Sequence, residues 1–334
     1  MKTIGVGVIG LGMGKNMLAI NQDSHSVMEV RALCDTNEIM LEQVRAEYNI
    51  GFATTDYRQL LARPDIDVVG IYSPDHLHIE HITAAASAGK HIICTKPMVV
   101  SLEEAQRTVQ LVRQHKIKFL VGQTARFSPE FMAAKKLYDD GDLGRPLFAE
   151  AHYVHDMRKV HERTPWRRDV PQDSLYGGAC HPIDLLRWFL GDVDEVFVYA
   201  SQSNFNPGYT VHDNFLINLR FKNGVIARVL AVFGLVEPPL PMLGLGIYGD
   251  KGSVVNDQIV LDKLAGQPVL KLNFGHEKGH GREVWRYMRH FEECLLADKR
   301  PLIDELEGAQ VIATAAACWE SIHTGLPVKV VRVE

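Results

Sequence analysis

The chain has 334 residues, of which 46% are hydrophobic and 23% are charged, and its formal net charge is −5. This length suggests about two domains, and the composition supplies enough apolar material for a core in each. The small negative charge argues against a nucleic acid or an anionic membrane surface as a partner.

The N-terminal sequence and the cysteines bear on the cellular compartment. A short apolar run leads into a glycine turn at Gly10, without the apolar stretch and cleavage site of a signal peptide. No window has the roughly 18 uninterrupted apolar residues that a membrane span needs. The five cysteines are scattered and form no C-x-x-C pair. We therefore expect a cytoplasmic protein with reduced thiols and no membrane segment.

The first third of the chain alternates short apolar runs with helical stretches. We expect buried strands at residues 3–9, 29–35, 68–72, 91–94 and 119–121. Helices of about ten to fifteen residues are expected between them. Ser101 and Glu104 form a capping box at the start of the last of these helices. Strands that alternate with helices predict βαβ units, and hence a parallel sheet with helices on both faces.

After about Gly122 the pattern changes to runs of strand character. We expect strands at residues 147–155, 195–201, 214–221, 225–233 and 244–248. Lys222-Asn223-Gly224 is a hairpin signal between two of them. Helices that cover one face of this sheet are expected near residues 181–190, 284–297 and 307–324. The sequence thus predicts an α/β domain over residues 1–122, then an α+β domain over residues 123–334 with a large open, mostly antiparallel sheet.

The turn between the first strand and the first helix reads Gly10-Leu11-Gly12-Met13-Gly14. Glycines allow a tight turn and close approach of a pyrophosphate, and the helix N-terminus supplies free N–H groups. The usual spacing is G-x-G-x-x-G, but here the third glycine comes one residue early and Lys15 takes its place. The position between a strand and a helix is the context that this motif requires. We therefore expect Gly10, Gly12, Met13 and Gly14 to bind a cofactor in a Rossmann domain.

Asp35 ends the second strand, where an acid can accept hydrogen bonds from an adenosine ribose. The plainer alternative is a turn aspartate that caps the next helix, a role that Asn37 could share. No arginine follows Asp35 to meet a 2′-phosphate. NAD is therefore the favoured cofactor, with NADP as the alternative.

More specific motifs lie further along the chain. Ser73-Pro74-Asp75-His76-Leu77-His78 is followed by Ala88-Gly89-Lys90-His91 and then by Thr95-Lys96-Pro97. Gly122 opens a loop that continues to Pro129, and Gly177-Gly178-Ala179-Cys180-His181-Pro182 precedes a helix. Over essentially the whole chain, the sequence resembles the glucose–fructose oxidoreductase, inositol dehydrogenase and MocA (Gfo/Idh/MocA) family.

The resemblance implies a Rossmann domain, an α+β domain and an active cleft between them. It implies an NAD(P)-dependent dehydrogenase or reductase that transfers a hydride between nicotinamide and a hydroxyl or ketone of a sugar, inositol or related polyol. It further implies a homodimer or homotetramer. The cofactor contacts that it adds are Ser73, Asp75, His78, Thr95, Lys96 and Pro97.

Two positions depart from the family pattern. The family's Glu-Lys-Pro is Thr95-Lys96-Pro97 here, so one hydroxyl replaces a glutamate that helps to hold the nicotinamide ribose. The family often has an aspartate four residues before its histidine, and this position is Gly177. Asp184, after His181, and Asp173, upstream of it, are the remaining candidates for an aspartate partner.

Lys96 and His181 are the expected catalytic residues. A neutral histidine can accept the hydroxyl proton, and the dipole at a helix start disfavours the imidazolium of His181. Lys96 follows the fifth strand at the carboxyl edge of the sheet, where its ammonium can stabilise a developing alkoxide. The plainer alternatives are a solvated lysine at a strand end and a histidine that caps its helix or bonds Asp184.

Several other side chains suit the hydroxyls and faces of a sugar, although each could equally be packing or surface. The candidate substrate contacts are Lys96, Arg126, Tyr153, Trp166, Arg167, His181 and Asp184. No metal site is expected, because the helical spacing of His76, His78 and His81 does not gather three ligands on one face. Two alternatives to a dehydrogenase stay open: a glycosidase of the same family that uses bound NAD transiently, and a non-catalytic protein that binds NAD or a sugar and regulates a partner.

Overall fold

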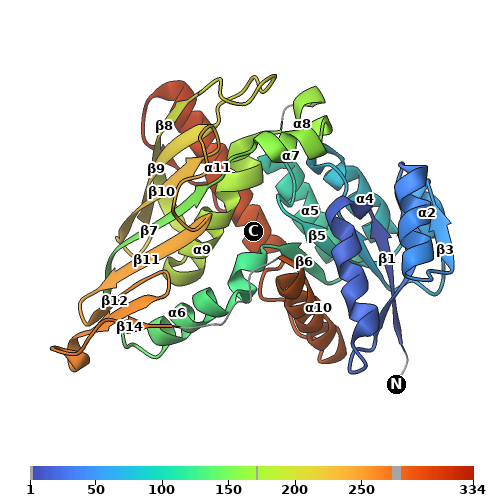
Figure 1. Ribbon diagram of the computed structural model, residues 1–334, viewed down its shortest axis with the longest axis horizontal. Helices are drawn as coiled ribbons and strands as arrows, with labels where there is room; N and C mark the ends of the chain where they lie inside the picture. The colour runs from blue at the N-terminus through green and yellow to red at the C-terminus, as the bar shows by residue number, and fades with distance from the viewer. Residues whose placement is uncertain (1–2, 171, 273–279) are drawn as a thin grey trace. The chain divides into compact units, whose positions relative to one another are not determined.

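The computed structural model describes residues 3–170, 172–272 and 280–334 (Figure 1). The chain divides into two compact units. Unit 1 comprises Met1–Thr124, Gly279–Ala309 and Val333–Glu334, and unit 2 comprises Ala125–Lys278 and Gln310–Arg332. No helix among the described residues is both long and apolar enough to cross a membrane.

Unit 1 is built on a six-stranded sheet of order β3-β2-β1-β4-β5-β6, in which all the described pairings are parallel. Its strands are β1 (Ile4–Ile9), β2 (Met28–Cys34), β3 (Phe52–Thr54), β4 (Val68–Ile71), β5 (His91–Thr95) and β6 (Phe119–Gly122). The strand order reverses between β1 and β4, and ligands bind at such a switch point outside the carboxyl ends of the strands. The parallel sheet predicted from the alternating pattern is confirmed.

The helices of unit 1 lie between these strands in sequence, except the last one, which comes from a later segment of the chain. They are α1 (Leu11–Gly14), the 3-10 helix η1 (Lys15–Gln22), α2 (Glu38–Glu47), α3 (Tyr57–Leu61), η2 (Asp75–Leu77), α4 (His78–Ser87), α5 (Leu102–His115) and α10 (His280–Leu296). Ser101 caps α5 as predicted, because its side chain accepts a hydrogen bond from Glu104 N. The first helix follows β1 directly, since Gly10, at φ 89°, turns the chain from β1 into α1.

Unit 2 is built on a nine-stranded sheet of order β14-β13-β12-β11-β7-β10-β9-β8-β15. Its strands are β7 (Pro146–Val154), β8 (Val193–Ser201), β9 (Asn214–Phe221), β10 (Ile226–Val232), β11 (Leu243–Gly249), β12 (Gly252–Val255), β13 (Gln258–Leu261), β14 (Leu270–Lys271) and β15 (Val328–Lys329). Among the described strands of this second sheet, only β10 and β7 pair in parallel. The predicted mostly antiparallel sheet and the hairpin at Gly224, whose φ is 86°, are thus confirmed.

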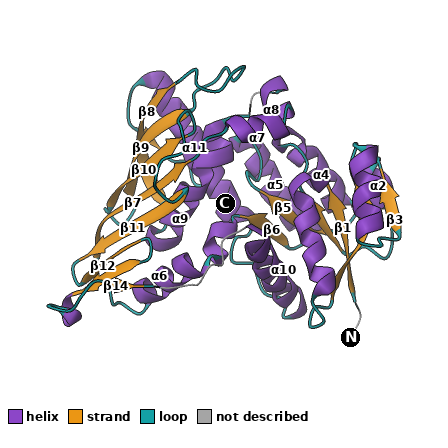
Figure 2. Cartoon of the chain, viewed as in Figure 1, coloured by secondary structure: helices purple, strands orange, loops and turns teal. Residues whose placement is uncertain are grey.

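The helical elements of unit 2 are η3 (Thr124–Phe127), α6 (Pro129–Asp139), α7 (Arg158–Arg163), α8 (Trp166–Asp169), a π-helical turn η4 (Leu175–Ala179), α9 (Cys180–Leu190), η5 (Asp262–Leu264) and the larger part of α11 (Glu305–Thr324). Among them, α9 and α11 lie against one face of the sheet (Figure 2). The alternation along β9 shows the two faces: Phe215 and Ile217 are buried, whereas Leu216 and Asn218 are exposed. One face of the sheet therefore packs in the core, and the other is open.

Candidate functional site

The glycines of the turn after β1 differ in what an added β-carbon would meet. A β-carbon on Gly10 would lie 2.6 Å from the carbonyl of Tyr72, and one on Gly14 would lie 2.9 Å from Val8 Cγ1. A β-carbon on Gly12 would meet no protein atom within 4 Å. Gly10 and Gly14 are therefore required by packing, while Gly12 faces open space at a helix N-terminus. The predicted residue Met13 is exposed on the same turn.

Asp35 connects this turn to the end of β2. Its Oδ2 accepts a hydrogen bond from Leu11 N at 2.7 Å, and its Oδ1 accepts one from Asn37 N at 2.8 Å. The N-cap of α2 is Asn37, whose side chain accepts from Met40 N. Asp35 is thus not the helix cap, and a carboxylate with about four lone-pair sites can accept further hydrogen bonds. This geometry fits a ribose next to the glycine turn.

The loops that follow β4 and β5 are joined by His78, which is 1% exposed. Its Nδ1 lies 2.9 Å from Pro97 O, and its Nε2 lies 2.9 Å from Ser73 O. Burial lowers the pKa of His78, against the opposing effects of the Ser73 carbonyl and the Asp75 carboxylate. The sequence predicted a cofactor contact for this residue, but its ring nitrogens face main-chain carbonyls. The structure gives it the role of holding the two loops together.

Ser73 has a second partner that the sequence did not identify. Its Oγ lies 2.8 Å from Nδ1 of His81, whose ring packs edge-on against Tyr57 with 4.5 Å between centroids. Burial lowers the pKa of His81 to about 4, so its ring is neutral at pH 7. A neutral imidazole in this place fixes the Ser73 hydroxyl at the carboxyl end of β4. Asp75 is also buried and accepts from His76 N.

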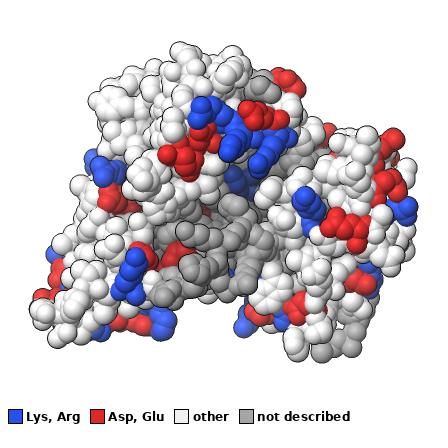
Figure 3. Space-filling view, in the orientation of Figure 1, with Lys and Arg blue, Asp and Glu red and all other residues white. Residues whose placement is uncertain are grey.

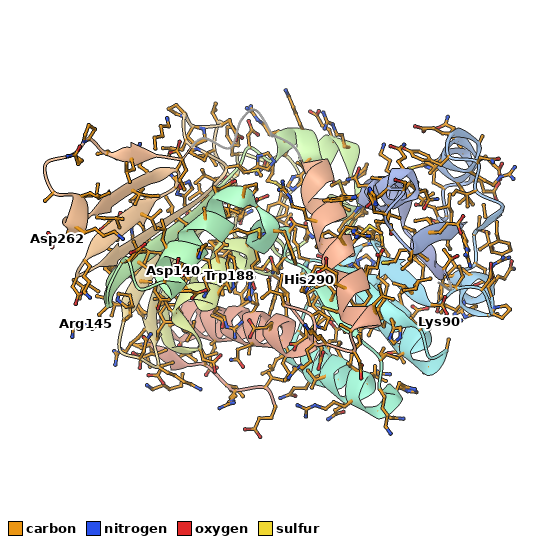
Figure 4. All side chains as sticks on the ribbon, turned by 90° about the horizontal axis from the view of Figure 1, so that it is seen from below. Lys90, Asp140, Arg145, Trp188, Asp262 and His290 are labelled. Carbon is orange, nitrogen blue, oxygen red and sulfur yellow. The ribbon has the colours of Figure 1, made fainter. Side chains whose placement is uncertain are left out.

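Thr95 and Lys96 lie where the sequence placed them, at the carboxyl end of β5. Thr95 pairs with Gly122 of β6, and a β-carbon on Gly122 would lie 3.1 Å from Thr95 Cα. Pro97 is buried and follows Lys96 through a cis peptide bond. At the opposite, amino end of β5, Lys90 donates from Nζ to the carbonyls of Arg63 and Ile66 (Figure 4). Lys90 therefore has a structural role away from the carboxyl edge.

In unit 2, His181 lies in the first turn of α9 and packs against Tyr153 of β7, with 5.3 Å between ring centroids. Tyr153 in turn packs against Phe233, at 5.5 Å. A β-carbon on Gly178 would lie 2.2 Å from the Phe233 ring, so this glycine allows the π-helical turn to pass over the aromatic side chain. Such turns inside helices are frequent at functional sites. Desolvation raises the pKa of the Tyr153 hydroxyl well above its ordinary value, so the phenol stays protonated.

Arg126 and Asp184 form an ion pair in the interior of unit 2. Arg126 donates from Nε to Asp184 Oδ2 at 2.9 Å and from Nη2 to Oδ1 at 2.7 Å, and the two side chains are 2% and 0% exposed. The guanidinium also lies 5.8 Å from the ring centroid of Trp188 (Figure 4). The sequence predicted both residues as substrate contacts. The structure shows that they form a buried pair that joins η3 to α9, the helix of His181.

The other candidate aspartate is held elsewhere in unit 2. Asp173 accepts a hydrogen bond from Leu175 N at 2.8 Å and another from the indole Nε1 of Trp319. It therefore fixes the start of the π-helical turn. The two remaining substrate candidates, Trp166 and Arg167, contact each other. The guanidinium carbon of Arg167 lies 4.4 Å from the ring centroid of Trp166, and Nη1 of Arg167 donates to Gln172 Oε1 at 2.9 Å.

Two further observations concern the charge of the surface and the side chains that can bind metal ions among the described residues. On the face shown in Figure 3, Lys and Arg side chains lie among Asp and Glu side chains, with no extended area of one sign. No group of three His, Cys, Asp or Glu side chains in the described ranges is placed to hold a metal ion.

Comparisons with known proteins agree with this geometry. A family model described as "Oxidoreductase family, NAD-binding Rossmann fold" matches residues 4–123, and a "GFO/IDH/MocA C-terminal domain" model matches residues 131–255. An uncharacterized oxidoreductase of Bacillus subtilis is 28% identical over 100% of this chain and 98% of its own length. Levoglucosan dehydrogenase of Pseudarthrobacter phenanthrenivorans is 31% identical over 76% of this chain and 74% of its own length.

Solved structures show the same fold. Levoglucosan dehydrogenase in complex with NADH and L-sorbose superposes with a TM-score of 0.91 at 25% identity, over 100% of both chains. A scyllo-inositol dehydrogenase of Lactobacillus casei, with bound NAD(H) and scyllo-inositol, superposes with a TM-score of 0.81 at 22% identity over 98% of this chain and 99% of that one. At 22% identity, the similarity to the scyllo-inositol dehydrogenase shows a shared fold alone.

Proposed function

Because the chain belongs to the Gfo/Idh/MocA family of oxidoreductases, we propose that it is an NAD-dependent dehydrogenase or reductase acting on a hydroxyl or ketone of a sugar, an inositol or a related polyol. The observation that carries this proposal is the open space at Gly12, next to a helix N-terminus and to the Asp35 carboxylate. A dinucleotide needs such a place for its pyrophosphate and its adenosine ribose.

The cofactor when bound supplies the hydride acceptor or donor, and the protein supplies binding and orientation. Gly10, Gly12, Met13 and Gly14 would bind the pyrophosphate, and Asp35 would bind the adenosine ribose. The residues at the carboxyl ends of β4 and β5 would contact the nicotinamide half; they are Ser73, Asp75, Thr95, Lys96 and Pro97. We propose NAD rather than NADP because the Asp35 carboxylate would repel a 2′-phosphate.

Lys96 and His181 would carry the proton and charge steps of the reaction. During oxidation, a neutral His181 accepts the hydroxyl proton at a ring nitrogen, and the Lys96 ammonium stabilises the negative charge that develops on the substrate oxygen. Tyr153 supports the His181 ring, and the Arg126–Asp184 pair positions α9. Trp166 and Arg167 are the proposed contacts to the sugar face and hydroxyls.

We also propose a cytoplasmic homodimer or homotetramer. All five cysteines are buried and form no disulfide, as expected of a reducing compartment. The open face of the unit 2 sheet exposes apolar side chains, among them Tyr199 and Ile226, at 63% and 56%. An exposed apolar sheet face of this kind suits contact with a second copy.

The test is a spectrophotometric screen at the absorbance of NADH, with NAD or NADP and a panel of sugars, inositols and sugar acids. We expect turnover that is lost in Lys96→Met and His181→Ala but kept in Lys136→Met, whose side chain is 76% exposed on α6. Measurable NAD binding without turnover of any substrate would overturn the dehydrogenase and favour a regulatory protein. Hydrolysis of a glycoside with no net NADH would favour the glycosidase instead.

A further inference from the structure

Gln123 follows β6, the edge strand of the unit 1 sheet on the side opposite β2. Asp35, at the end of β2, occupies the side that receives an adenosine ribose. Neighbouring strands lie about 4.8 Å apart, so β6 is roughly 14 Å from β1 across the sheet. A dinucleotide that places its adenosine half over β2 extends in the other direction, over the ends of β4, β5 and β6.

The side-chain amide oxygen of Gln123 is buried without the hydrogen bond that burial normally requires. The residue is 2% exposed, and its Oε1 accepts no hydrogen bond from any described residue. Its main-chain N–H donates to Val121 O at 2.8 Å. The side-chain amide of Asn21, in the same unit, donates to Val30 O and accepts from Val30 N.

A buried amide oxygen without a partner costs about 1–3 kcal/mol, so such an atom in a native protein calls for an explanation. Gln123 lies directly after Gly122, which pairs with Thr95 at the end of β5. Thr95 offers a single hydroxyl at this edge of the sheet. An amide beside it adds one strong acceptor and two donors, which is the complement of ribose hydroxyls or of a carboxamide.

We propose that Gln123 is a cofactor-binding residue whose side-chain amide bonds the nicotinamide riboside end of NAD. The proposal rests on the proposed NAD-dependent function. Binding of the cofactor satisfies the amide oxygen, which has no hydrogen-bond partner among the described residues of the unliganded protein. The affinity for NAD then depends on Gln123, whereas the stability of the unliganded fold does not.

The experiment compares Gln123→Leu with Gln110→Leu, which makes the same change at an exposed position of α5. The dissociation constant of NADH is measured by its fluorescence, and that of ADP by calorimetry, because ADP lacks the nicotinamide riboside. We expect Gln123→Leu to raise the Kd of NADH by about 3- to 10-fold, which corresponds to one net hydrogen bond. The Kd of ADP should stay at the wild-type value. The unfolding midpoint without ligand should stay at the wild-type value or rise.

Gln110→Leu should change none of these quantities. An unchanged Kd of NADH in Gln123→Leu would overturn the proposal, and so would equal losses of NADH and ADP affinity together with a lowered unfolding midpoint. If the leucine variant does not fold, Gln123→Met keeps the unbranched shape and gives the same readouts. A wild-type protein that fails to bind NADH would refute the proposed function itself, whereas normal turnover and binding in Gln123→Leu would refute only the role of Gln123.

Discussion

Asp35 accepts a hydrogen bond from the main chain of Leu11, with 2.7 Å between Leu11 N and Asp35 Oδ2. The contact ties the end of β2 to the first residue of α1, so one carboxylate both shapes the turn and presents a negative charge beside it. Its second oxygen accepts from Asn37 N. In the proposed function, cofactor choice would therefore depend on the same side chain as the local fold.

Asp35→Asn should weaken NAD binding and improve NADP binding. The amide keeps one acceptor but loses the charge, and hydrogen bonds to charged groups are worth about 1.5–3 kcal/mol. We expect the Kd of NAD to rise about tenfold or more, and the preference for NAD over NADP to fall because the repulsion of a 2′-phosphate is gone. Fluorescence titration with NADH and NADPH measures both constants. Asp56→Asn, at the N-cap of α3, is the control and should leave the preference unchanged.

Gly12→Ala should separate cofactor binding from folding. The new β-carbon meets no protein atom, and alanine favours a helix over glycine by about 1 kcal/mol, so the unfolding midpoint should not fall. The same β-carbon occupies the space that the pyrophosphate needs, so the Kd of NAD should rise at least about tenfold. Calorimetry gives the Kd and thermal denaturation gives the midpoint.

Two other glycines serve as controls for this experiment. Gly51→Ala lies outside the turn and also meets no atom within 4 Å, so it should change neither quantity. Gly10→Ala should destabilise the fold, because its φ of 89° and the Tyr72 carbonyl at 2.6 Å both exclude a β-carbon. Normal NAD affinity in Gly12→Ala would show that the pyrophosphate binds elsewhere.

The strands of unit 1 could be predicted because a buried parallel strand is apolar on both faces and is bounded by turn residues. β1, for example, covers Ile4–Ile9 where residues 3–9 were predicted. β3, β12, β13, β14 and β15 were not predicted. They have two to four residues each, so they carry little periodic pattern, and their pairing is set by neighbouring strands.

The partners of the candidate site residues could not be predicted, because sequence spacing does not reveal contacts between distant segments. Arg126 and Asp184 have the residue types of substrate contacts, and only the fold shows that they bind each other. Glu292 of α10 accepts from Val27 N and Met28 N of unit 1, more than 260 positions away in the sequence. His78 was identified by its motif, but its two carbonyl partners depend on how two loops meet.

Arg126→Ala should destabilise unit 2 strongly. The substitution leaves the Asp184 carboxylate buried without its partner cation, and breaking a buried pair in this way costs about 3–5 kcal/mol. The double variant Arg126→Met with Asp184→Leu removes both charges and should recover most of the loss. Urea denaturation measures the free energy of unfolding of each variant. Arg145→Ala, whose side chain is 78% exposed and 3.7 Å from Asp250, is the control and should cost less than about 1 kcal/mol (Figure 4).

His81 should make the stability depend on pH between about 4 and 6.5. Burial lowers the pKa of His81 to about 4 in the folded protein, whereas a histidine in the unfolded chain titrates near about 6.5. Between these values the unfolded chain binds a proton that the folded chain does not bind. The free energy of unfolding therefore falls as the pH drops through this window, by up to about 3 kcal/mol for a shift of this size.

The measurement is urea denaturation of wild type and His81→Gln at pH values from 7 to 4. Carboxylates titrate over the same range in both proteins, so the difference between the two curves isolates His81. We expect His81→Gln to be less stable than wild type at pH 7, because the partner of Ser73 is altered, and to lose less stability on acidification. His25→Gln replaces an exposed histidine and should follow the wild-type curve. Parallel curves for wild type and His81→Gln would mean that His81 titrates in the folded protein near its ordinary pKa, and that it does not hold the Ser73 hydroxyl as a neutral ring.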